Sequence, residues 1–156
     1  MTSRRVPILL TSSFVAIFAM GTADCQESKI KFNDLPPQVQ ATAKVESKGA
    51  TVKGYSKEIE KGKTEYEVQL LVDGKSRDVS IDPAGKVIET ESQVDFASVP
   101  DKAKDAIQRE AGGAKVEKVE EVKSDQATVY EAVIHKGGKK HEIRVLENGD
   151  KAPPED

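Results

Sequence analysis

The side chains that could carry out chemistry lie in two related stretches, TEYEVQLLVDGKSRDVSIDPAG at 64–85 and TVYEAVIHKGGKKHEIRVLENG at 128–149. Paired carboxylates such as Glu65 and Glu67 can do acid–base work. Charged residues make up 33% of the chain, however, so such pairs arise without any catalytic role. A nucleophilic serine or cysteine needs a base and an orienting acid, and no serine of the sequence stands in a glycine-flanked elbow. We therefore expect no catalytic residue, no cofactor and no enzymatic activity.

The two histidines of the sequence, His135 and His141, flank the segment HKGGKKH and raise the question of a metal site. In the hairpin that this segment predicts, the two side chains point to opposite faces of the sheet and cannot share one ion. The lysines beside them would also repel a cation. The turns at 82–85 and 147–150 lack the alternating oxygen ligands of calcium loops. We expect no metal site.

Both stretches belong to a longer self-similarity with an offset of 64 residues and no gap. Aromatic, proline and glycine positions coincide: Phe32 with Phe96, Pro36 with Pro100, Tyr66 with Tyr130, Gly74 with Gly138, and Gly85 with Gly149. Such turn and packing positions are what a duplicated fold retains. The sequence thus predicts two tandem repeats, and leaves open whether their sheets join into one.

Each repeat is expected to open with a helix and to continue as a meander of strands. Asp34 and Ser98 are candidate N-caps, and glycines at 49 and 112–113 supply the left-handed stops. Strands are expected at 50–59, 64–72 and 86–90. The second and third strands of each repeat are joined by tight turns at Asp73-Gly74 and at 137–138, which are strong two-residue hairpin signals.

Pairing outward from these turns places Val68 opposite Val79 and Ala132 opposite Ile143, on one apolar face that the helices cover. The other face is polar and solvated, as antiparallel sheets permit. Its side chains form the coherent polar surface that the pattern predicts, and they are our candidate partner-binding residues: Glu65, Glu67, Gln69 and Asp78 in the first repeat, and Glu131, His135, Glu142 and Arg144 in the second.

The first residues have the pattern of a secretory signal peptide. Arg4 and Arg5 precede the apolar run VPILLTSSFVAIFAM, and the small residues at 21–23 offer a cleavage site. The run is too short and too interrupted for a membrane anchor, which needs about 20 apolar residues. Cys25 is the only cysteine and follows an aspartate, unlike a bacterial lipobox, so we expect neither lipidation nor an intramolecular disulfide. A periplasmic or extracellular protein with no stable membrane span follows.

Several short motifs resemble the PepSY-like family, in particular the tandem form that is similar to the beta-lactamase inhibitor protein. They are the Leu35-Pro36 helix start, the Tyr-Glu-Val strand start at 66–68, the Gly74-Lys75 hairpin and the D-x-x-G turn at 82–85. The resemblance covers roughly residues 30–150. It implies an α+β fold of two tandem helix-plus-antiparallel-meander repeats, with the helices packed on one face of the sheet or sheets.

The expected organisation is a signal peptide at 1–23, a disordered mature N-terminus at 24–29, repeats at 30–90 and 91–150, and a disordered tail at 151–156. The resemblance implies an exported, non-enzymatic module that binds a protein or peptide through the open sheet face, with peptidase inhibition or envelope regulation as its outcome. The alternative is an envelope sensor or stress protein that binds a small ligand or a metal ion.

The composition limits both alternatives. The net charge is -3, and acidic and basic residues are interspersed, whereas a nucleic-acid module shows clustered Lys and Arg. We therefore expect no nucleic-acid partner. Four Phe, three Tyr and no Trp leave few of the aromatic anchors on which a tight protein interface depends, which argues against a high-affinity enzyme inhibitor of the same kind.

Overall fold

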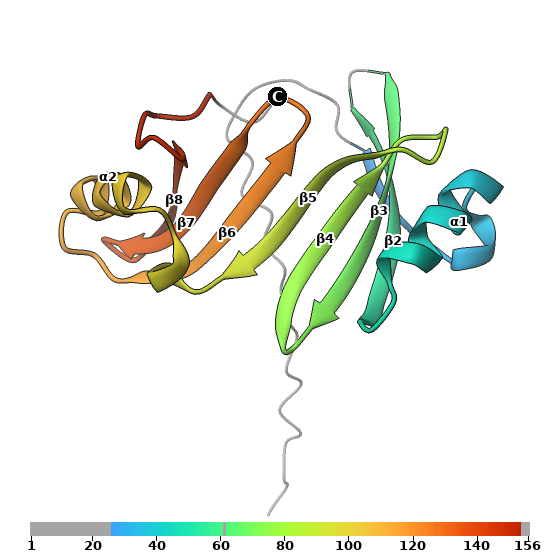
Figure 1. The fold of residues 1–156 in the computed structure, drawn as a ribbon, viewed down its shortest axis with the longest axis horizontal. Coiled ribbons are helices and arrows are strands. Elements are labelled where there is room, and N and C mark those ends of the chain that lie inside the picture. The colour runs from blue at the N-terminus through green and yellow to red at the C-terminus, as the bar shows by residue number, and fades with distance from the viewer. Residues whose placement is uncertain (1–25, 61, 154–156) are drawn as a thin grey trace, which may run out of the picture.

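The computed structural model describes residues 26–60 and 62–153. The expected signal peptide, Cys25 and the last three residues of the tail lie outside the described residues, so those expectations stay predictions. In the described part the chain forms eight strands, two α-helices and two short 3-10 helices. Figure 1 shows one broad, curved sheet with both α-helices on the same side, each against a different end of it.

The eight strands pair with their sequence neighbours, all antiparallel, in the order β1 to β8. The elements are β1 (Gln26–Ile30), η1 (Phe32–Asp34), α1 (Pro37–Glu46), β2 (Thr51–Glu60), β3 (Lys63–Val72), β4 (Lys75–Ile81), β5 (Val87–Val94), η2 (Phe96–Ser98), α2 (Asp101–Ala111), β6 (Val116–Ser124), β7 (Thr128–Lys136) and β8 (Lys139–Leu146). We call β1 to β5 the first half of the sheet and β6 to β8 the second half.

The predicted fold class is wrong. The chain is a single sheet-dominated fold, not an α+β pair of tandem helix-plus-meander repeats, because the strand expected at 86–90 continues to Val94 and pairs with β6. The pairing runs from Glu89 opposite Ser124 to Val94 opposite Val119 and makes the sheet continuous. The two α-helices have only 10 and 11 residues. A pairing between strands that a helix separates in sequence is not signalled by any local turn, so the motifs did not show it.

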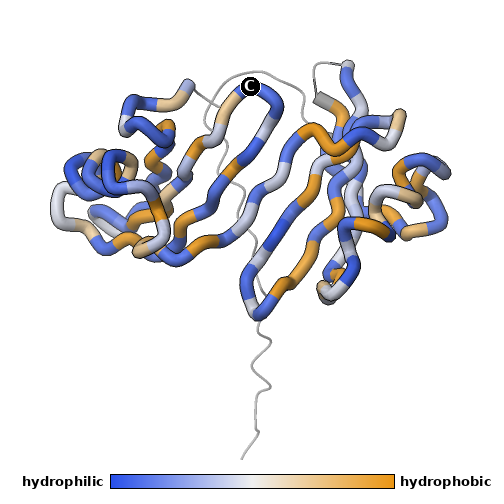
Figure 2. The backbone as a smooth tube through the Cα atoms, viewed as in Figure 1, coloured by the Kyte–Doolittle hydropathy of each residue, from blue (hydrophilic) through white to orange (hydrophobic). Residues whose placement is uncertain are grey.

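The predicted hairpin registers are confirmed. Val68 lies opposite Val79, and Ala132 lies opposite Ile143. The turn residues take the left-handed backbone that a two-residue hairpin requires, with φ of 50° at Asp73 and 82° at Gly74, and 60° and 76° at 137 and 138. Apolar and polar residues alternate along the strands (Figure 2), so a slip of one residue would expose the whole apolar set.

Two hydrophobic clusters lie between the sheet and its helices. In the first half, α1 and the segment before it pack onto β3 and β4, with these residues buried: Leu35, Val39, Ala43, Val68, Leu70, Val79 and Ile81. In the second half, α2 packs onto β6, β7 and β8 through a similar set: Val99, Ala103, Ala106, Ile107, Ala111, Val119, Tyr130, Ala132, Ile134, Ile143 and Val145. Small residues on the helices let them lie close to the sheet.

The helices begin later than predicted. Asp34 and Ser98 each end a short 3-10 turn, while Pro36 and Pro100 stand at the N-cap positions of α1 and α2. A residue before proline is disfavoured in the helical region, and the residues before Pro36 and Pro100 are indeed extended, with ψ of 145° and 138°. The side chain of Asp34 instead accepts a hydrogen bond from the backbone N–H of Lys31 at 3.0 Å.

The expectation of disorder at the two ends of the folded chain is wrong for their described parts. Gln26–Ile30 forms β1 against β2, and Ile30 packs onto the first cluster. At the other end, the backbone N–H of Ala152 donates to the carbonyl of Arg144 at 3.1 Å, and Lys151 forms an isolated bridge with Val145. The backbone therefore returns along the free edge of β8 for a few residues after the turn at 147–150.

Candidate partner-binding face

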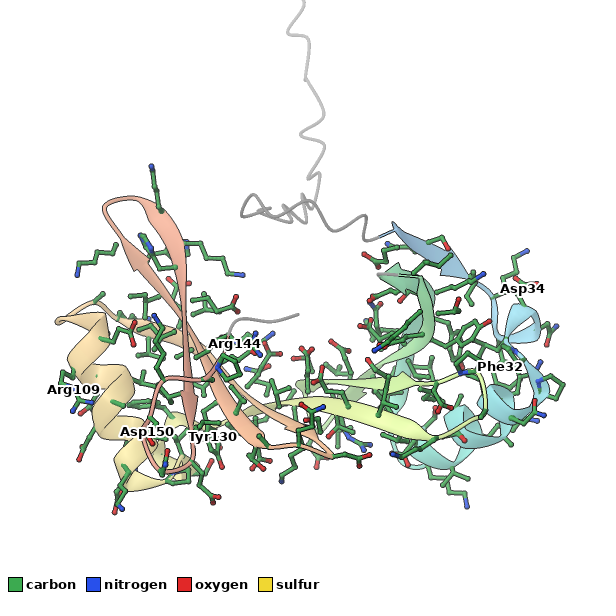
Figure 3. All side chains as sticks on the ribbon, turned by 90° about the horizontal axis from the view of Figure 1, so that it is seen from above. Phe32, Asp34, Arg109, Tyr130, Arg144 and Asp150 are labelled. Carbon is green, nitrogen blue, oxygen red and sulfur yellow. The ribbon has the colours of Figure 1, made fainter. Side chains whose placement is uncertain are left out.

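The eight predicted site residues all project from the face of the sheet that the helices leave uncovered, which we call the open face. The ladder shows this: Glu67 lies opposite Ser80, Gln69 opposite Asp78, and Glu131 opposite Arg144, each in alternation with residues that face a helix. Figure 3 shows the sheet bent toward this face, with Arg144 on the side away from α2. The eight residues do not meet in one cluster, since β5 and β6 separate the β3–β4 group from the β7–β8 group.

Glu67 is a strongly perturbed group of the open face. Burial raises the pKa of this carboxyl to about 7, and the charges of Asp78, Glu58 and Glu27 add to the effect. The Nε2 of Gln69 donates a hydrogen bond to Glu67 Oε1 at 2.7 Å, which opposes the rise. The pKa of Asp78 is also raised, again mainly by burial and then by Glu120. These two carboxyls are thus less solvated than the alternation of residues predicts.

Ser56 lies directly opposite Glu67 on the neighbouring strand β2. Its side chain is only 1% exposed, and its hydroxyl has no hydrogen-bond partner among the described residues. A buried hydroxyl without a partner costs free energy, so this position is unusual for the middle of a sheet face. Sequence reasoning missed Ser56, although it did place the adjacent strand correctly.

Several carboxylates of the second half lie against basic side chains. Arg144 Nε lies 2.7 Å from Glu131 Oε1, and both side chains are largely buried. Lys118 Nζ lies 2.5 Å from Glu120 Oε1, and His135 Nδ1 lies 2.9 Å from Glu117 Oε2. The structure thus brings together two of the predicted residues, Glu131 and Arg144, as an ion pair. Glu142 remains exposed on β8.

An apolar cluster covers part of the same half. Val122, Val129 and Ala152 are buried there, with Leu146 packed against them. Ala152 belongs to the returning C-terminal segment and is 5% exposed. At the ladder positions 64 residues earlier, the first half has Glu58 in place of Val122 and Glu65 in place of Val129. At these positions the second half of the open face is therefore apolar and covered, whereas the first half carries carboxylates.

The first half carries an excess of carboxylates. Its described open-face ladder positions hold seven, with lysines only at the margins: Glu27, Glu58, Glu65, Glu67, Asp78, Glu89 and Glu91, against Lys29 and Lys63. The second half holds three carboxylates against three bases: Glu120, Glu131 and Glu142 against Lys118, Lys140 and Arg144. The first half of the face is therefore strongly negative, and the second is close to neutral.

The histidines lie as the register predicts, with His135 opposite Lys140 on the open face and His141 opposite Ile134 on the other. Within residues 26–60 and 62–153, no three His, Cys, Asp or Glu side chains gather in an arrangement that could hold a metal ion. An open depression of about 550 Å³ lies at the strand ends, lined in part by Glu65, Asp82 and Ser124.

Two comparisons found nothing: no protein-family model matches the chain, and neither does any curated protein. Solved structures do match. A BLIP-like protein from Bacteroides fragilis has a TM-score of 0.58 at 19% identity, over 76% of this chain and 84% of that one. A DUF2874 family protein from Bacteroides ovatus has a TM-score of 0.60 at 17% identity, over 77% and 86%. A Bacteroides eggerthii protein named for a periplasmic location has a TM-score of 0.63 at 18% identity, over 76% and 86%.

At these identities the likeness shows the fold alone, and that fold is BLIP-like. The PepSY-like assignment made from the short motifs stays a prediction. Neither α1 nor α2 is long or apolar enough to cross a membrane, and the described residues contain no other helix that is.

Proposed function

We propose that the chain is an exported, non-enzymatic PepSY-like binding module that engages a protein or peptide through the open face of its sheet. The observation that carries this proposal is the difference in cover between the two faces. The helices and their two clusters close one face, and Ala152 closes part of the other, while the acidic first half of the open face carries no covering element among the described residues.

The similar structures support the same reading by their names, since one is a BLIP-like protein and another is named for the periplasm. Inhibition of a peptidase or regulation in the envelope would be the outcome of such binding. The alternative, a sensor that binds a small ligand or a metal ion, has no specific observation in its favour within the described residues. A thermal-shift screen of divalent ions on the mature chain tests it, because a ligand of the native state raises stability by mass action.

Affinity capture from the exported fraction of the native host tests the proposal. The bait is the chain that begins after residue 23, and the matched bait carries Glu67→Lys and, at an exposed position of the second half, Glu142→Lys. We expect a protein that the first bait retains and the second loses. A third bait with reversed charges on the exposed face of α2, Asp105→Lys and Glu110→Lys, is the control. A partner that the α2 variant loses and the open-face variant keeps would contradict the proposal.

A further inference from the structure

Glu67 and Glu131 occupy corresponding ladder positions, but the residue opposite each of them on the neighbouring strand differs, and only Glu131 has a cation there. Adding 64 to a residue number of the β3–β4 hairpin gives the corresponding position of the β7–β8 hairpin. Glu67 thus corresponds to Glu131, and its neighbour Ser80 corresponds to Arg144. In the second half the arginine neutralises the glutamate at 2.7 Å. In the first half a serine stands where that cation would come from.

No lysine or arginine among the described residues forms an ion pair with Glu67. Its carboxylate accepts a hydrogen bond from the neutral amide of Gln69, and the charged side chains around it are acidic: Asp78 on β4, Glu58 on β2 and Glu27 on β1. Lys29 faces Ser56 from β1 but is exposed. Burial and the neighbouring carboxylates both disfavour the ionised form of Glu67. A cation supplied by another molecule would stabilise that form.

Ser56 gives a second and independent indication. Its hydroxyl is buried beside Glu67, has no partner among the described residues, and can both donate and accept. The corresponding position of the second half is Glu120, which pairs with Lys118. The first half therefore has an acceptor carboxylate and an unsatisfied hydroxyl on adjacent strands, at the point where the second half is filled by its own side chains.

We propose that the first half of the open face binds an arginine-bearing segment of a partner protein, whose guanidinium pairs with Glu67 at the position that Arg144 occupies beside Glu131. This inference rests on the proposed function and names the chemistry of the partner. The seven carboxylates of the first half supply the charge complementarity and attract such a segment from a distance.

The chemistry favours a guanidinium over other cations. A guanidinium is planar, weakly hydrated and offers five donors, so it can pair with a half-buried carboxylate and also donate to a nearby hydroxyl. An ammonium is more strongly hydrated and loses more when it is brought against a desolvated surface. A divalent metal ion requires several oxygen ligands converging on one point, and the described residues show no such group.

The direct test is a titration of the isotope-labelled mature chain with a short peptide of alternating glycine and arginine, followed by the amide resonances. We expect the amides of Ser56, Glu67 and Ser80 to shift most. The same peptide with citrulline in place of arginine keeps the shape and loses the charge, and should bind about tenfold or more weakly. Equal shifts with the two peptides would overturn the inference.

Two variants of the chain sharpen the test. Glu67→Gln should weaken the arginine peptide about tenfold. Ser80→Arg supplies the cation from within, as in the second half, and should abolish the shifts around Glu67. Glu110→Gln, on the exposed face of α2, is the matched control and should bind as the wild type does. Amide spectra and thermal unfolding establish that each variant folds. Wild-type affinity in either Glu67→Gln or Ser80→Arg contradicts the inference.

Failure of this inference can be told apart from failure of the proposed function. A captured partner that tolerates Glu67→Gln and Ser80→Arg, yet is lost with Glu142→Lys, leaves the open face as the binding surface and removes the arginine site. If a partner is captured and no substitution on the open face affects its capture, both the arginine site and the proposed binding through the open face are wrong.

Discussion

Glu67 on β3 and Glu131 on β7 stand at corresponding ladder positions, and their surroundings differ completely. Glu131 is 7% exposed and pairs with Arg144 on the adjacent strand. Glu67 faces Ser80 at that place, and burial among other carboxylates raises its pKa to about 7. A buried charge is tolerated when it is paired and costly when it is not, so the second half stabilises itself and the first half keeps an unbalanced charge.

The same contrast extends across the open face. Val122 and Val129 pack beneath Ala152 in the second half, whereas the corresponding residues of the first half are Glu58 and Glu65. On the helix side the halves agree, since Val68 pairs with Val79 as Ala132 pairs with Ile143. The shared positions are the ones that packing requires. The differing positions lie on the open face, and our proposal assigns the binding surface to the first half of that face.

Arg144→Ala should produce the largest stability difference between the halves. It leaves Glu131 buried without its cation, and breaking a buried pair from one side costs about 3–5 kcal/mol. Ser80→Ala, at the corresponding position, removes no charge and should change the free energy of unfolding by less than about 0.5 kcal/mol. Urea denaturation of both variants at neutral pH measures this. A loss below about 1 kcal/mol in Arg144→Ala would show that the second half does not depend on this pair.

Substitution of the turn glycines at 85 and 149 should destabilise the two halves by similar amounts, because both turns pack against a helix in the same way. Both have positive φ, at 88° and 84°. A Cβ would lie 2.9 Å from the Gln38 carbonyl oxygen at position 85 and 2.6 Å from the Lys102 carbonyl oxygen at position 149. We expect Gly85→Ala and Gly149→Ala each to lose about 2–4 kcal/mol, from left-handed strain together with displacement of the helix.

The control for the turn glycines is Gly74→Ala. This residue also has positive φ, but a Cβ there meets nothing within 4 Å. It should lose only the cost of the left-handed backbone, about 1 kcal/mol. Thermal or urea unfolding measures the three variants. If Gly85→Ala and Gly149→Ala lost no more stability than Gly74→Ala, the close approach of turn and helix would not contribute to stability.

The sequence predicts the hairpins well because their determinants are local. Asp73-Gly74 and the glycines at 137–138 set the turns, and the alternation of residues such as Val68 and Leu70 sets the register. The union of the two halves depends instead on pairing between β5 and β6, with η2 and α2 between them in the chain. Pairing over such a separation is not encoded in any short motif, so the predicted fold class failed there.

The sequence predicts which residues share the open face, but it does not predict the electrostatics of that face. Alternation places Glu67 and Glu131 on the open face, but it gives no measure of burial. Register irregularities between Val52 and Gly54, and between Val116 and Lys118, change which residues of β2 and β6 face the helices. Counting alternate residues along β2 therefore does not tell on which face a residue beyond the bulge, such as Ser56, lies. The desolvation of Glu67 depends on neighbours from several strands, which alternation along one strand does not show.

Glu67→Gln should stabilise the chain and flatten its pH dependence. The folded pKa of Glu67 is raised from 4.5 to about 7, so the native state binds more protons than the unfolded state between these values. The stability that the protonated group contributes is complete below about 4.5 and is lost as the pH rises through about 7. At about pH 8 the variant should be about 1–3 kcal/mol more stable than the wild type.

The groups that face Glu67 are Asp78, Glu58 and Glu27, with Gln69 as its hydrogen-bond donor, so the slope includes their titration. Urea unfolding at several pH values measures it. Glu142→Gln, exposed on β8, is the control and should follow the wild-type curve within about 0.5 kcal/mol. A wild-type slope that persists unchanged in Glu67→Gln would place the proton uptake elsewhere.

Tyr130→Phe should have the smallest effect and compares the halves on the helix side. The hydroxyl of Tyr130 donates to Glu121 Oε1 at 3.1 Å, and burial together with this carboxylate raises the pKa of the phenol to about 12. Loss of this bond should cost about 1–2 kcal/mol. Tyr66, its counterpart, forms no side-chain hydrogen bond among the described residues, so Tyr66→Phe should be nearly neutral. The folded pKa of Tyr130 is raised, so the stability that its neutral phenol contributes is complete below about pH 10. It is lost as the pH rises through about 12. In a titration followed by tyrosinate absorbance, the most alkaline step of the wild type should therefore be missing from Tyr130→Phe. If the variant kept that step, the step would belong to another residue.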